Sequence, residues 1–541
     1  MSEETNVHQV IAQGLTAHGV RVLFGLMGDA NLFMADDYIR SQGGRFVPVA
    51  HEGSAVLAAM GYAQISGEVG AATVTHGPAL TNCVTPLVEG VKGRFPIVLL
   101  AGDTPASRPE HHQNVDQREL VKATGAGFEQ MRSPATAGAD VARAFYRARV
   151  ERRPIVLNMP VDFMWEPSET GALPMPVFTE EPRGVGQSDV LDEAIGMIAS
   201  ARRPLILAGG GAINAREALI KLADRLEAPL AHSLKGKGLF QDHPFNIGFF
   251  GTLSSPAAYD VMAQADCIVA FGTSLNFYTT DYGQLMAGKR VIHVDLEPES
   301  IGGSRHPEAA IIADAAAAAE TIHYWLDEAE IAPSGFTKDL DPAALRHYPA
   351  PANKTPEGNI NYVAALQALN AALPEDRIFV ADVGRFMLES WVRIDVPDAQ
   401  SFIPVTNFTC IGLGLQTALG AAAAAPDRPV VAFCGDGGFM LGGLNELFTA
   451  VSQGLDLIVV VANDSAYGAE HIQFAARGMD PSPSHLDWPG FTEVARSMGA
   501  QAIKVNSTST LEEACAAIDT RNGPLLIELV LDPADMPPIR K

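Results

Sequence analysis

Residues 430–468 read VVAFCGDGGFMLGGLNELFTAVSQGLDLIVVVANDSAYG, and this stretch decides the fold. The apolar run 430–433 is typical of a buried parallel strand and breaks into a glycine-rich turn at 435–438. Apolar residues near the helical period follow over 440–451, and a second β-branched run ends at Asn463. We therefore predict a strand, a helix and a second parallel strand, whose polar ends emerge at the same edge of a sheet.

The turn carries groups that bind phosphate and metal. Gly435, Gly437 and Gly438 let the backbone approach a diphosphate, whose oxygens would meet N–H groups at the positive end of the following helix. Asp436 and, 27 residues later (463 − 436), Asn463 offer hard oxygen ligands. Such ligands suit Mg²⁺ or Ca²⁺ bridging to phosphate. A Gly-Asp-Gly turn alone is weak evidence, so the prediction depends on the Asn that closes the next strand.

Length and composition limit the class of protein. At 541 residues the chain is too long for one core, and we expect three domains. The formal net charge of −25 argues against nucleic acid or an anionic membrane as a partner. No apolar run reaches the ~20 residues of a membrane helix, and the polar start carries no export signal, so we expect a cytoplasmic protein. The five cysteines lack metal-site spacing and indicate reduced thiols.

Alternating helical and strand patterns predict an α/β fold of three consecutive domains with parallel sheets covered by helices. We place the domains at residues 1–166, 188–330 and 358–541, with linkers at 167–182 and around Pro351 and Lys354. The elements expected in the first domain are helices at 7–18 and from Ser54, and strands at 22–26, 46–50, 72–75, 97–100 and 155–159. In the central domain, residues 209–211 are three glycines without the GxGxxG pattern, which favours a tight turn over a nucleotide loop.

The stretch 430–468 resembles the cofactor motif of thiamine-diphosphate enzymes. The domain order resembles their pyruvate decarboxylase, benzoylformate decarboxylase and acetolactate synthase branch. The resemblance implies that the first domain binds the aminopyrimidine and the third the diphosphate. It also implies that the cofactor spans two subunits of a homodimer or homotetramer. The implied metal ligands are Asp436, Asn463 and the Ser465 carbonyl. The family usually has an Asn-Asn doublet where this chain has Ala462-Asn463, and the loop from Asn463 to Tyr467 is one residue longer than in many relatives.

The same resemblance supplies further cofactor contacts. Glu52 matches the glutamate that hydrogen-bonds the pyrimidine N1′, although a glutamate in a first helical turn is also stabilised by the helix dipole alone. By position, the Thr409 carbonyl accepts the N4′–H and Ile411 wedges between the two rings. The remaining implied cofactor-binding residues are Gly384, Tyr467 and Gly468.

The resemblance leaves the reaction open between two main fates of the enamine that remains after CO₂ loss. The candidate catalytic residues besides Glu52 are Asp29, His76, His111, His112, Gln117 and Glu470. Asp29, His111, His112 and Glu470 match the proton donors of 2-keto acid decarboxylases. His76 matches a proton-relaying histidine of benzoylformate decarboxylase, and Gln117 a glutamine of carboligating relatives. Each also has a plain interpretation, such as a helix N-cap for Asp29.

We therefore predict a thiamine-diphosphate- and Mg²⁺-dependent lyase that decarboxylates a 2-keto acid or acts on a hydroxy ketone. The alternatives are a carboligase similar to acetolactate synthase or benzaldehyde lyase, and an acyl-CoA lyase of the oxalyl-CoA decarboxylase type. A non-catalytic protein of this fold would be expected to lose Glu52, Asp436 or Asn463, and all are present.

Overall fold

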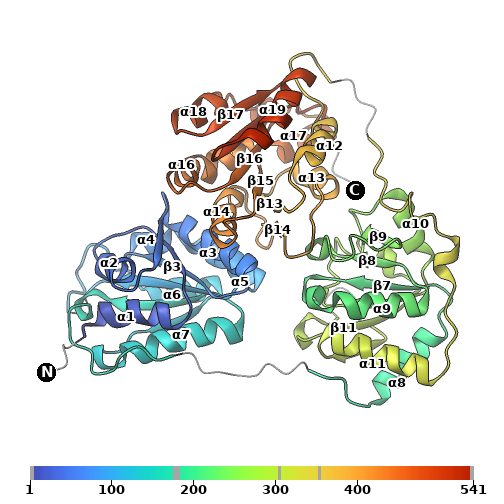
Figure 1. Cartoon of the computed structure of the whole chain (residues 1–541), viewed down its shortest axis with the longest axis horizontal. Coiled ribbons are helices and arrows are strands. Elements are labelled where there is room, and N and C mark those ends of the chain that lie inside the picture. Colours follow the sequence, from blue (N-terminus) through green and yellow to red (C-terminus); the bar gives the residue numbers. More distant parts are fainter. Residues whose placement is uncertain (1–4, 106, 175–182, 303–305, 351–354, 537–541) are drawn as a thin grey trace. The chain divides into compact units, whose positions relative to one another are not determined.

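The computed structural model describes residues 5–105, 107–174, 183–302, 306–350 and 355–536. These residues form three six-stranded sheets, one after another along the chain, as the alternating pattern predicts (Figure 1). By its contacts the chain divides into two compact units, one with the first sheet and the third sheet except β14 (Phe402–Pro404), and the other with the central sheet and residues 392–404. Residues 175–182 of the first predicted linker, Pro351 and Lys354 of the second, and the ends of both outer domains lie outside the described residues. The domain boundaries stay predictions.

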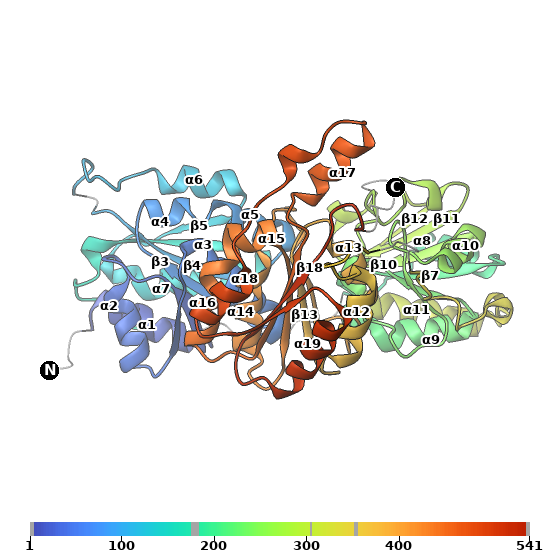
Figure 2. The ribbon, with the colours of Figure 1, turned by 90° about the horizontal axis from the view of Figure 1, so that it is seen from above.

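The first sheet has the strand order β2-β1-β3-β4-β6-β5, and its neighbouring strands pair in parallel. Its strands are β1 (Val22–Gly25), β2 (Arg45–Pro48), β3 (Gly70–Val74), β4 (Ile97–Asp103), β5 (Gly127–Gln130) and β6 (Ile155–Pro160). Its helices are α1 (Val7–Ala17), α2 (Leu32–Arg40), α3 (Glu52–Ser66), α4 (Pro78–Thr81), α5 (Val84–Gly93), α6 (Gln117–Thr124) and α7 (Ala137–Glu151). One apolar cluster joins α1, α2 and α7 to one face of the sheet, and α6 lies on the other side (Figure 2).

Two details of the first domain differ from the expectation. Strand β5 was not predicted, because its sequence Gly-Phe-Glu-Gln has no β-branched run and lies half-buried at the sheet edge. Helix α3 begins at Glu52, two residues before the expected Ser54, so Glu52 occupies its first turn.

The central sheet has the order β12-β11-β10-β7-β8-β9 and is also parallel. Its strands are β7 (Pro204–Ala208), β8 (Leu230–His232), β9 (Asn246–Phe249), β10 (Cys267–Phe271), β11 (Arg290–Asp295) and β12 (Ala309–Ile312). Helices α8 (Asp189–Ala199), α9 (Arg216–Leu226) and α11 (Ala315–Glu328) share an apolar cluster on one face, and α10 (Pro256–Gln264) belongs to a second cluster on the other (Figure 1).

The third sheet has the order β14-β13-β15-β16-β18-β17. Its strands are β13 (Ile378–Ala381), β14 (Phe402–Pro404), β15 (Val430–Gly435), β16 (Leu457–Asn463), β17 (Gln501–Val505) and β18 (Leu525–Val530). Its helices are α12 (Tyr362–Ala372), α13 (Met387–Arg393), α14 (Gly414–Ala424), α15 (Asp436–Gly438), α16 (Leu444–Ser452), α17 (Gly468–Ala476), α18 (Phe491–Ser497) and α19 (Thr508–Thr520). A π-helical turn, Phe439–Gly443, separates α15 from α16. Among the described residues no helix is long and apolar enough to cross a bilayer.

Helices α3 and α14 bring the first and third domains into backbone contact. A methyl group at Gly61 would overlap the carbonyl oxygen of Thr417, and one at Gly420 would overlap that of Ala58. Both glycines are therefore required by the close approach of the two helices, although glycine is unfavourable inside a helix.

We predict that Gly420→Ala destabilises the protein, because a methyl group forced against a backbone oxygen must shift a helix, at a cost of about 1–3 kcal/mol. The matched control is Gly196→Ala in α8, where the added methyl group meets no atom within 4 Å. That change should be neutral or stabilising, by up to about 1 kcal/mol. Thermal unfolding of both variants checks the prediction, and equal unfolding temperatures would contradict it.

Candidate functional site

Three loops meet at one edge of the third sheet, because β13, β15 and β16 are neighbouring parallel strands. The N–H of Asp382, just after β13, donates to the carbonyl of Phe433 in β15 (2.9 Å). Gly435, at the end of β15, lies beside Ala462 of β16 in the sheet register. The expected juxtaposition of the glycine-rich turn with the end of the next strand is therefore present.

Asp436 is buried in the turn after β15. Its carboxylate accepts hydrogen bonds from the indole Nε1 of Trp488 (3.0 Å) and the N–H of Gly437 (2.8 Å). Burial raises the pKa of Asp436 to about 6. Desolvation disfavours the charged form of a buried carboxylate, and a nearby cation stabilises that form. The surroundings of Asp436 therefore suit the metal ligand that the sequence predicts.

The other two predicted metal ligands, the side-chain oxygen of Asn463 and the carbonyl of Ser465, accept hydrogen bonds from the protein. Asn463 donates its amide to Glu528 Oε1 (2.9 Å), and its Oδ1 accepts from the N–H (3.1 Å) and hydroxyl (3.3 Å) of Ser465. The Ser465 carbonyl accepts from the N–H of Leu486 (2.8 Å). Both oxygens are therefore occupied by hydrogen bonds inside the third domain.

Asp464, which the sequence reasoning passed over, is buried beside Asp436. Burial, and then the negative charge of Asp436, raise the pKa of Asp464 to about 7, while Arg385 opposes the shift. The N–H of Ala466 lowers the pKa of both Asp436 and Asp464 by hydrogen bonding. Asp436 and Asp464 are thus two buried carboxylates close to each other, with the positively charged Arg385 near Asp464.

The π-helical turn changes the spacing between Asp436 and the end of β16. A π-turn holds more residues than an α-turn, so Phe439–Gly443 accommodates one additional residue between Asp436 and β16. The prediction of Asn463 as a metal ligand assumes a regular helix, and the additional residue makes Asp464 a second candidate.

Asp382 ties two predicted cofactor loops together. It is fully buried, and its carboxylate accepts from the N–H groups of Val383 (2.8 Å), Gly412 (2.8 Å) and Leu413 (3.3 Å). Burial raises the pKa of Asp382 to about 6, and these N–H groups oppose the shift. Thr409 lies in the adjoining loop with a left-handed φ of 60°.

The glycines of the predicted cradle are also closely packed. A methyl group at Gly437 would lie 3.0 Å from the ring of Tyr467, and one at Gly468 would lie 2.8 Å from Asp464 Oδ2. A methyl group at Gly438 would lie 2.9 Å from Asp382 Oδ2. Glycine at these positions is therefore required by the close packing of the loops against one another. Two more residues of the predicted cofactor site belong to neighbouring loops of the third domain. Gly384 follows β13, and the half-buried Ile411 precedes α14.

In the first domain, Glu52 stands at the carboxyl edge of the sheet. Its Oε2 accepts from the side-chain amide of Asn82 (2.9 Å). The preceding residue, His51, caps α3 by accepting the N–H of Gly53 at Nδ1 (3.0 Å). Glu52 is partly exposed, so its carboxylate is accessible to a ligand.

His76 and His111 form an edge-to-face pair with ring centroids 5.4 Å apart. His76 is only 4% exposed, and its Nδ1 has no hydrogen-bond partner among the described residues. Burial, and then His111, lower the pKa of His76, while the charges of Asp29 and Asp103 oppose the shift. His76 is therefore a neutral imidazole at pH 7 and can accept or donate a proton.

Gln117 is buried, and its amide is fully engaged. Its Oε1 accepts from the N–H of Gly77 (2.9 Å), and its Nε2 donates to the Gly102 carbonyl (2.9 Å) and to Asn158 Oδ1. These bonds anchor the loop that follows His76. Gln113, four residues earlier, is half-buried and packs its backbone against Gly77.

The structure does not gather the remaining candidates around the histidine pair. Asp29 is exposed in the turn before α2 and reaches His76 only through its charge. His112 is exposed in the loop before α6. Glu470 is exposed in α17 of the third domain.

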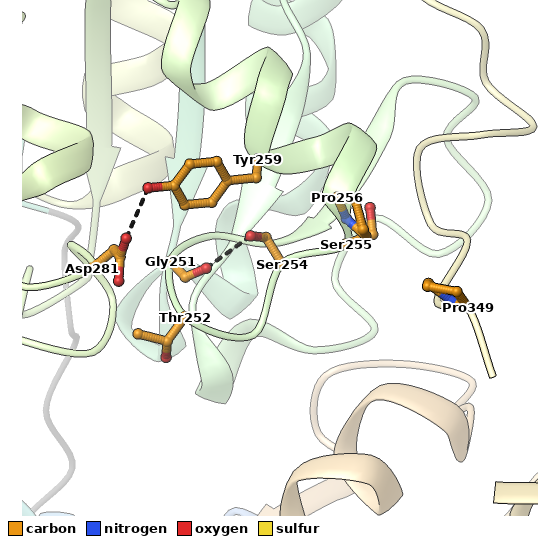
Figure 3. A pocket seen from close by; sticks show the side chains of 8 residues that line it. All are labelled: Gly251, Thr252, Ser254, Ser255, Pro256, Tyr259, Asp281 and Pro349. Carbon is orange, nitrogen blue, oxygen red and sulfur yellow. Dashed lines mark hydrogen bonds between the residues drawn. The ribbon is translucent and has the colours of Figure 1, made fainter. Parts of the chain in front are cut away.

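A cavity of about 370 Å³ opens in the central domain. It is lined by Gly251, Thr252, Ser254, Ser255, Pro256, Tyr259, Asp281 and Pro349. The hydroxyl of Tyr259 donates to Asp281 Oδ2 (2.8 Å), as Figure 3 shows. The glycine turn at 209–211 instead packs against Gly272, where added methyl groups would clash with the backbone.

The donor set at the third sheet fits a cation that is completed by a phosphate ligand. Among the described residues no group of three or more His, Cys, Asp or Glu side chains could hold a metal alone. Mg²⁺ is typically bound by one or two carboxylates together with phosphate oxygens. Asp436 and Asp464 are the buried carboxylates at this edge of the sheet, so the residues present fit such a cation.

Comparison with known proteins agrees with this architecture. Three family models match the chain: the N-terminal TPP binding domain of thiamine pyrophosphate enzymes over residues 5–122, their central domain over 191–322 and their C-terminal TPP binding domain over 382–529.

Curated relatives align over nearly the whole chain. A sulfoacetaldehyde acetyltransferase of Castellaniella defragrans is 30% identical, covering 93% of this chain and 89% of the relative. A probable 2-ketoarginine decarboxylase of Pseudomonas aeruginosa is 29% identical, over 96% and 93%. A probable acetolactate synthase large subunit of Methanocaldococcus jannaschii is 27% identical, over 98% and 93%. With all three domain models matched in order, the chain belongs to the thiamine pyrophosphate enzyme family.

Proposed function

We propose that this thiamine-diphosphate enzyme cleaves the bond between the carboxylate and the carbonyl carbon of a 2-keto acid and releases CO₂ and an aldehyde. The observation that carries the proposal is the buried His76, whose Nδ1 lacks a partner among the described residues and which stacks edge-to-face on His111. A proton donor at this position is what aldehyde release requires. The 2-ketoarginine decarboxylase relative supports the same reaction class.

Residues at the carboxyl edges of the first and third sheets would have different roles in this reaction. When bound, thiamine diphosphate supplies the nucleophilic carbon and accepts the electron pair that CO₂ leaves behind. Glu52 would hold the pyrimidine N1′ in a hydrogen bond. His76 and His111 would hold and deliver the proton that completes the aldehyde, with Asp29 and Asp103 stabilising the charged imidazolium form.

We propose a divalent cation at the third sheet, bound by Asp436, Asp464 and the carbonyl of Ala466, in place of the set with Asn463 and Ser465. Ala466 pairs with His485 in an antiparallel bridge whose hydrogen bonds are made by Ser465 and Tyr467. The N–H and C=O of Ala466 therefore face away from His485, on the side of the two carboxylates. The one-residue shift caused by the π-turn leads to the same choice.

A second candidate function is carboligation, in which a second carbonyl compound takes the place of the proton. The acetolactate synthase relative favours it. Gln117, the sequence-based candidate, would support either reaction indirectly by anchoring the loop after His76.

We predict that Asp464→Asn weakens Mn²⁺ binding, measured in the presence of thiamine diphosphate by titration calorimetry, by about tenfold or more, because a charged ligand is lost. Asn463→Ala should retain Mn²⁺ binding while lowering the unfolding temperature, since Glu528 loses a buried donor. The reverse result, with binding lost only in Asn463→Ala, would restore Asn463 as the ligand.

The same site predicts a pH dependence. The raised pKa values of about 6 and about 7 mean that Asp436 and Asp464 bind protons more tightly in the folded than in the unfolded protein. Without metal, stability should therefore fall as the pH rises through this range. Apparent Mn²⁺ affinity should rise over the same range, because protons cease to compete. Asp464→Asn should flatten both profiles, whereas unchanged profiles would contradict the assignment.

We predict that His76→Ala and His111→Ala each lower aldehyde release by about 10²-fold, the contribution of a positioned general acid. CO₂ release in a single turnover should fall less. His112→Ala is the matched control, since this neighbouring histidine is exposed. If aldehyde release is unchanged in both variants and a hydroxy ketone is the main product of the parent enzyme, the proposed function becomes that of a carboligase.

A further inference from the structure

Two buried glutamates link the first and third domains through backbone N–H groups. Glu446, in α16 of the third domain, is fully buried. Its Oε1 accepts from the N–H groups of Ala50 (3.1 Å) and His51 (3.1 Å) in the first domain, and its Oε2 accepts from the Ala50 N–H (3.3 Å) and the Thr449 hydroxyl (2.7 Å).

Glu89 makes the reciprocal contact from α5 of the first domain and is 1% exposed. Its Oε1 accepts from the N–H (3.0 Å) and the side-chain amide (2.6 Å) of Asn407, and its Oε2 accepts from the N–H of Phe408 (2.6 Å). Neither glutamate forms an ion pair within the described part of the chain, so backbone and side-chain donors solvate both carboxylates.

The bound segments are the two that lead into the predicted aminopyrimidine contacts. Ala50 and His51 immediately precede Glu52. Asn407 and Phe408 immediately precede Thr409 and the loop that carries Ile411. Each domain therefore holds, through one buried carboxylate, the segment of the other domain that presents a cofactor contact.

We propose that Glu446 and Glu89 are reciprocal positioning residues, and that Glu446 sets the position of Glu52 from across the domain boundary within the same chain. The proposal rests on the proposed function together with the assembly that the family resemblance implies, in which one cofactor lies between Glu52 of one subunit and Asp436 of its partner. Under that arrangement the Glu446 contact joins halves of two different active sites. Glu446 also lies in α16, which follows the Asp436 turn and the π-helical turn, so one short stretch of chain carries both Asp436 and the residue that contacts Ala50 and His51.

Glu446→Gln and Glu446→Ala should form a graded series. Gln keeps an oxygen that accepts the Ala50 and His51 N–H groups, whereas Ala leaves both without a buried acceptor. In the holoenzyme we expect proton exchange at the thiazolium C2 to slow a few-fold in the Gln variant and about tenfold or more in the Ala variant. Amide hydrogen exchange of residues 50–51 should accelerate in the same order, while Mn²⁺ affinity stays at the parental value.

The matched control is Glu513→Ala, an exposed glutamate of α19, which should change none of these measurements. Equal C2 exchange in Glu446→Ala and the parent would overturn the proposal. A loss of Mn²⁺ binding parallel to the loss of C2 exchange would also overturn it, because the effect would then lie on the side of Asp436.

Mixed dimers test which active site Glu446 serves. In a dimer of one Glu446→Ala chain and one Asp436→Ala chain, the single working site combines Asp436 of the Glu446→Ala chain with Glu52 of the other chain, which has an intact Glu446. In a dimer of one Glu446→Ala chain and one Glu52→Gln chain, the single working site uses Glu52 of the Glu446→Ala chain itself. We expect the first hybrid to match a parent and Asp436→Ala hybrid, and the second to be slower by about tenfold or more. Equal rates in the two hybrids would overturn the proposal.

A separate control distinguishes this failure from failure of the proposed assembly. Glu52→Gln and Asp436→Ala chains, each inactive alone, should recover activity when they form mixed dimers, because one complete site is assembled. No recovery in verified mixed dimers would place both halves of the site in one chain, and Glu446 would then not join halves of two different sites. In that case, C2 proton exchange in the Glu446→Gln and Glu446→Ala variants would still test whether Glu446 positions Glu52.

Discussion

The desolvation of carboxylates at the edge of the third sheet is the constraint on which the site depends. Asp382, Asp436 and Asp464 follow three neighbouring parallel strands, and burial raises the pKa of each. The three carboxylates differ in which groups stabilise their negative charge. Asp382 accepts hydrogen bonds from backbone N–H groups and holds two loops together, whereas the negative charges of Asp436 and Asp464 repel each other and favour a bound cation.

Much of this fold could be predicted from the sequence because a buried parallel sheet leaves a strong pattern. The runs at 430–433 and 457–461 are continuously apolar, and glycines or polar residues end them. The pattern fails where local sequence is ambiguous. Strand β5 is a short, half-polar edge strand, and the π-turn Phe439–Gly443 contains ordinary helix formers and glycines that give no warning of an additional residue.

Assigning side chains to roles was harder, since a role depends on hydrogen bonds to residues far away in the sequence. Asn463 has the residue type of a metal ligand, and its side chain is held by Glu528, 65 residues away, and by Ser465. Gln117 is similarly held by Gly77, which follows β3, and by Asn158 of β6. Glu446 reads as an exposed position of an amphipathic helix, and only the packing of two domains brings it to Ala50.

The contact between α3 and α14 has a mechanical consequence. At Gly61 and Gly420 the two helices touch through backbone atoms, with no layer of side chains between them. Side chains adjust by changing rotamer, but a helix backbone does not, so sliding of one helix along the other is blocked by its neighbour's carbonyl groups. The contact thereby fixes how far α3 and α14 are shifted along each other, and the Glu446 and Glu89 hydrogen bonds join the same two domains at two further points.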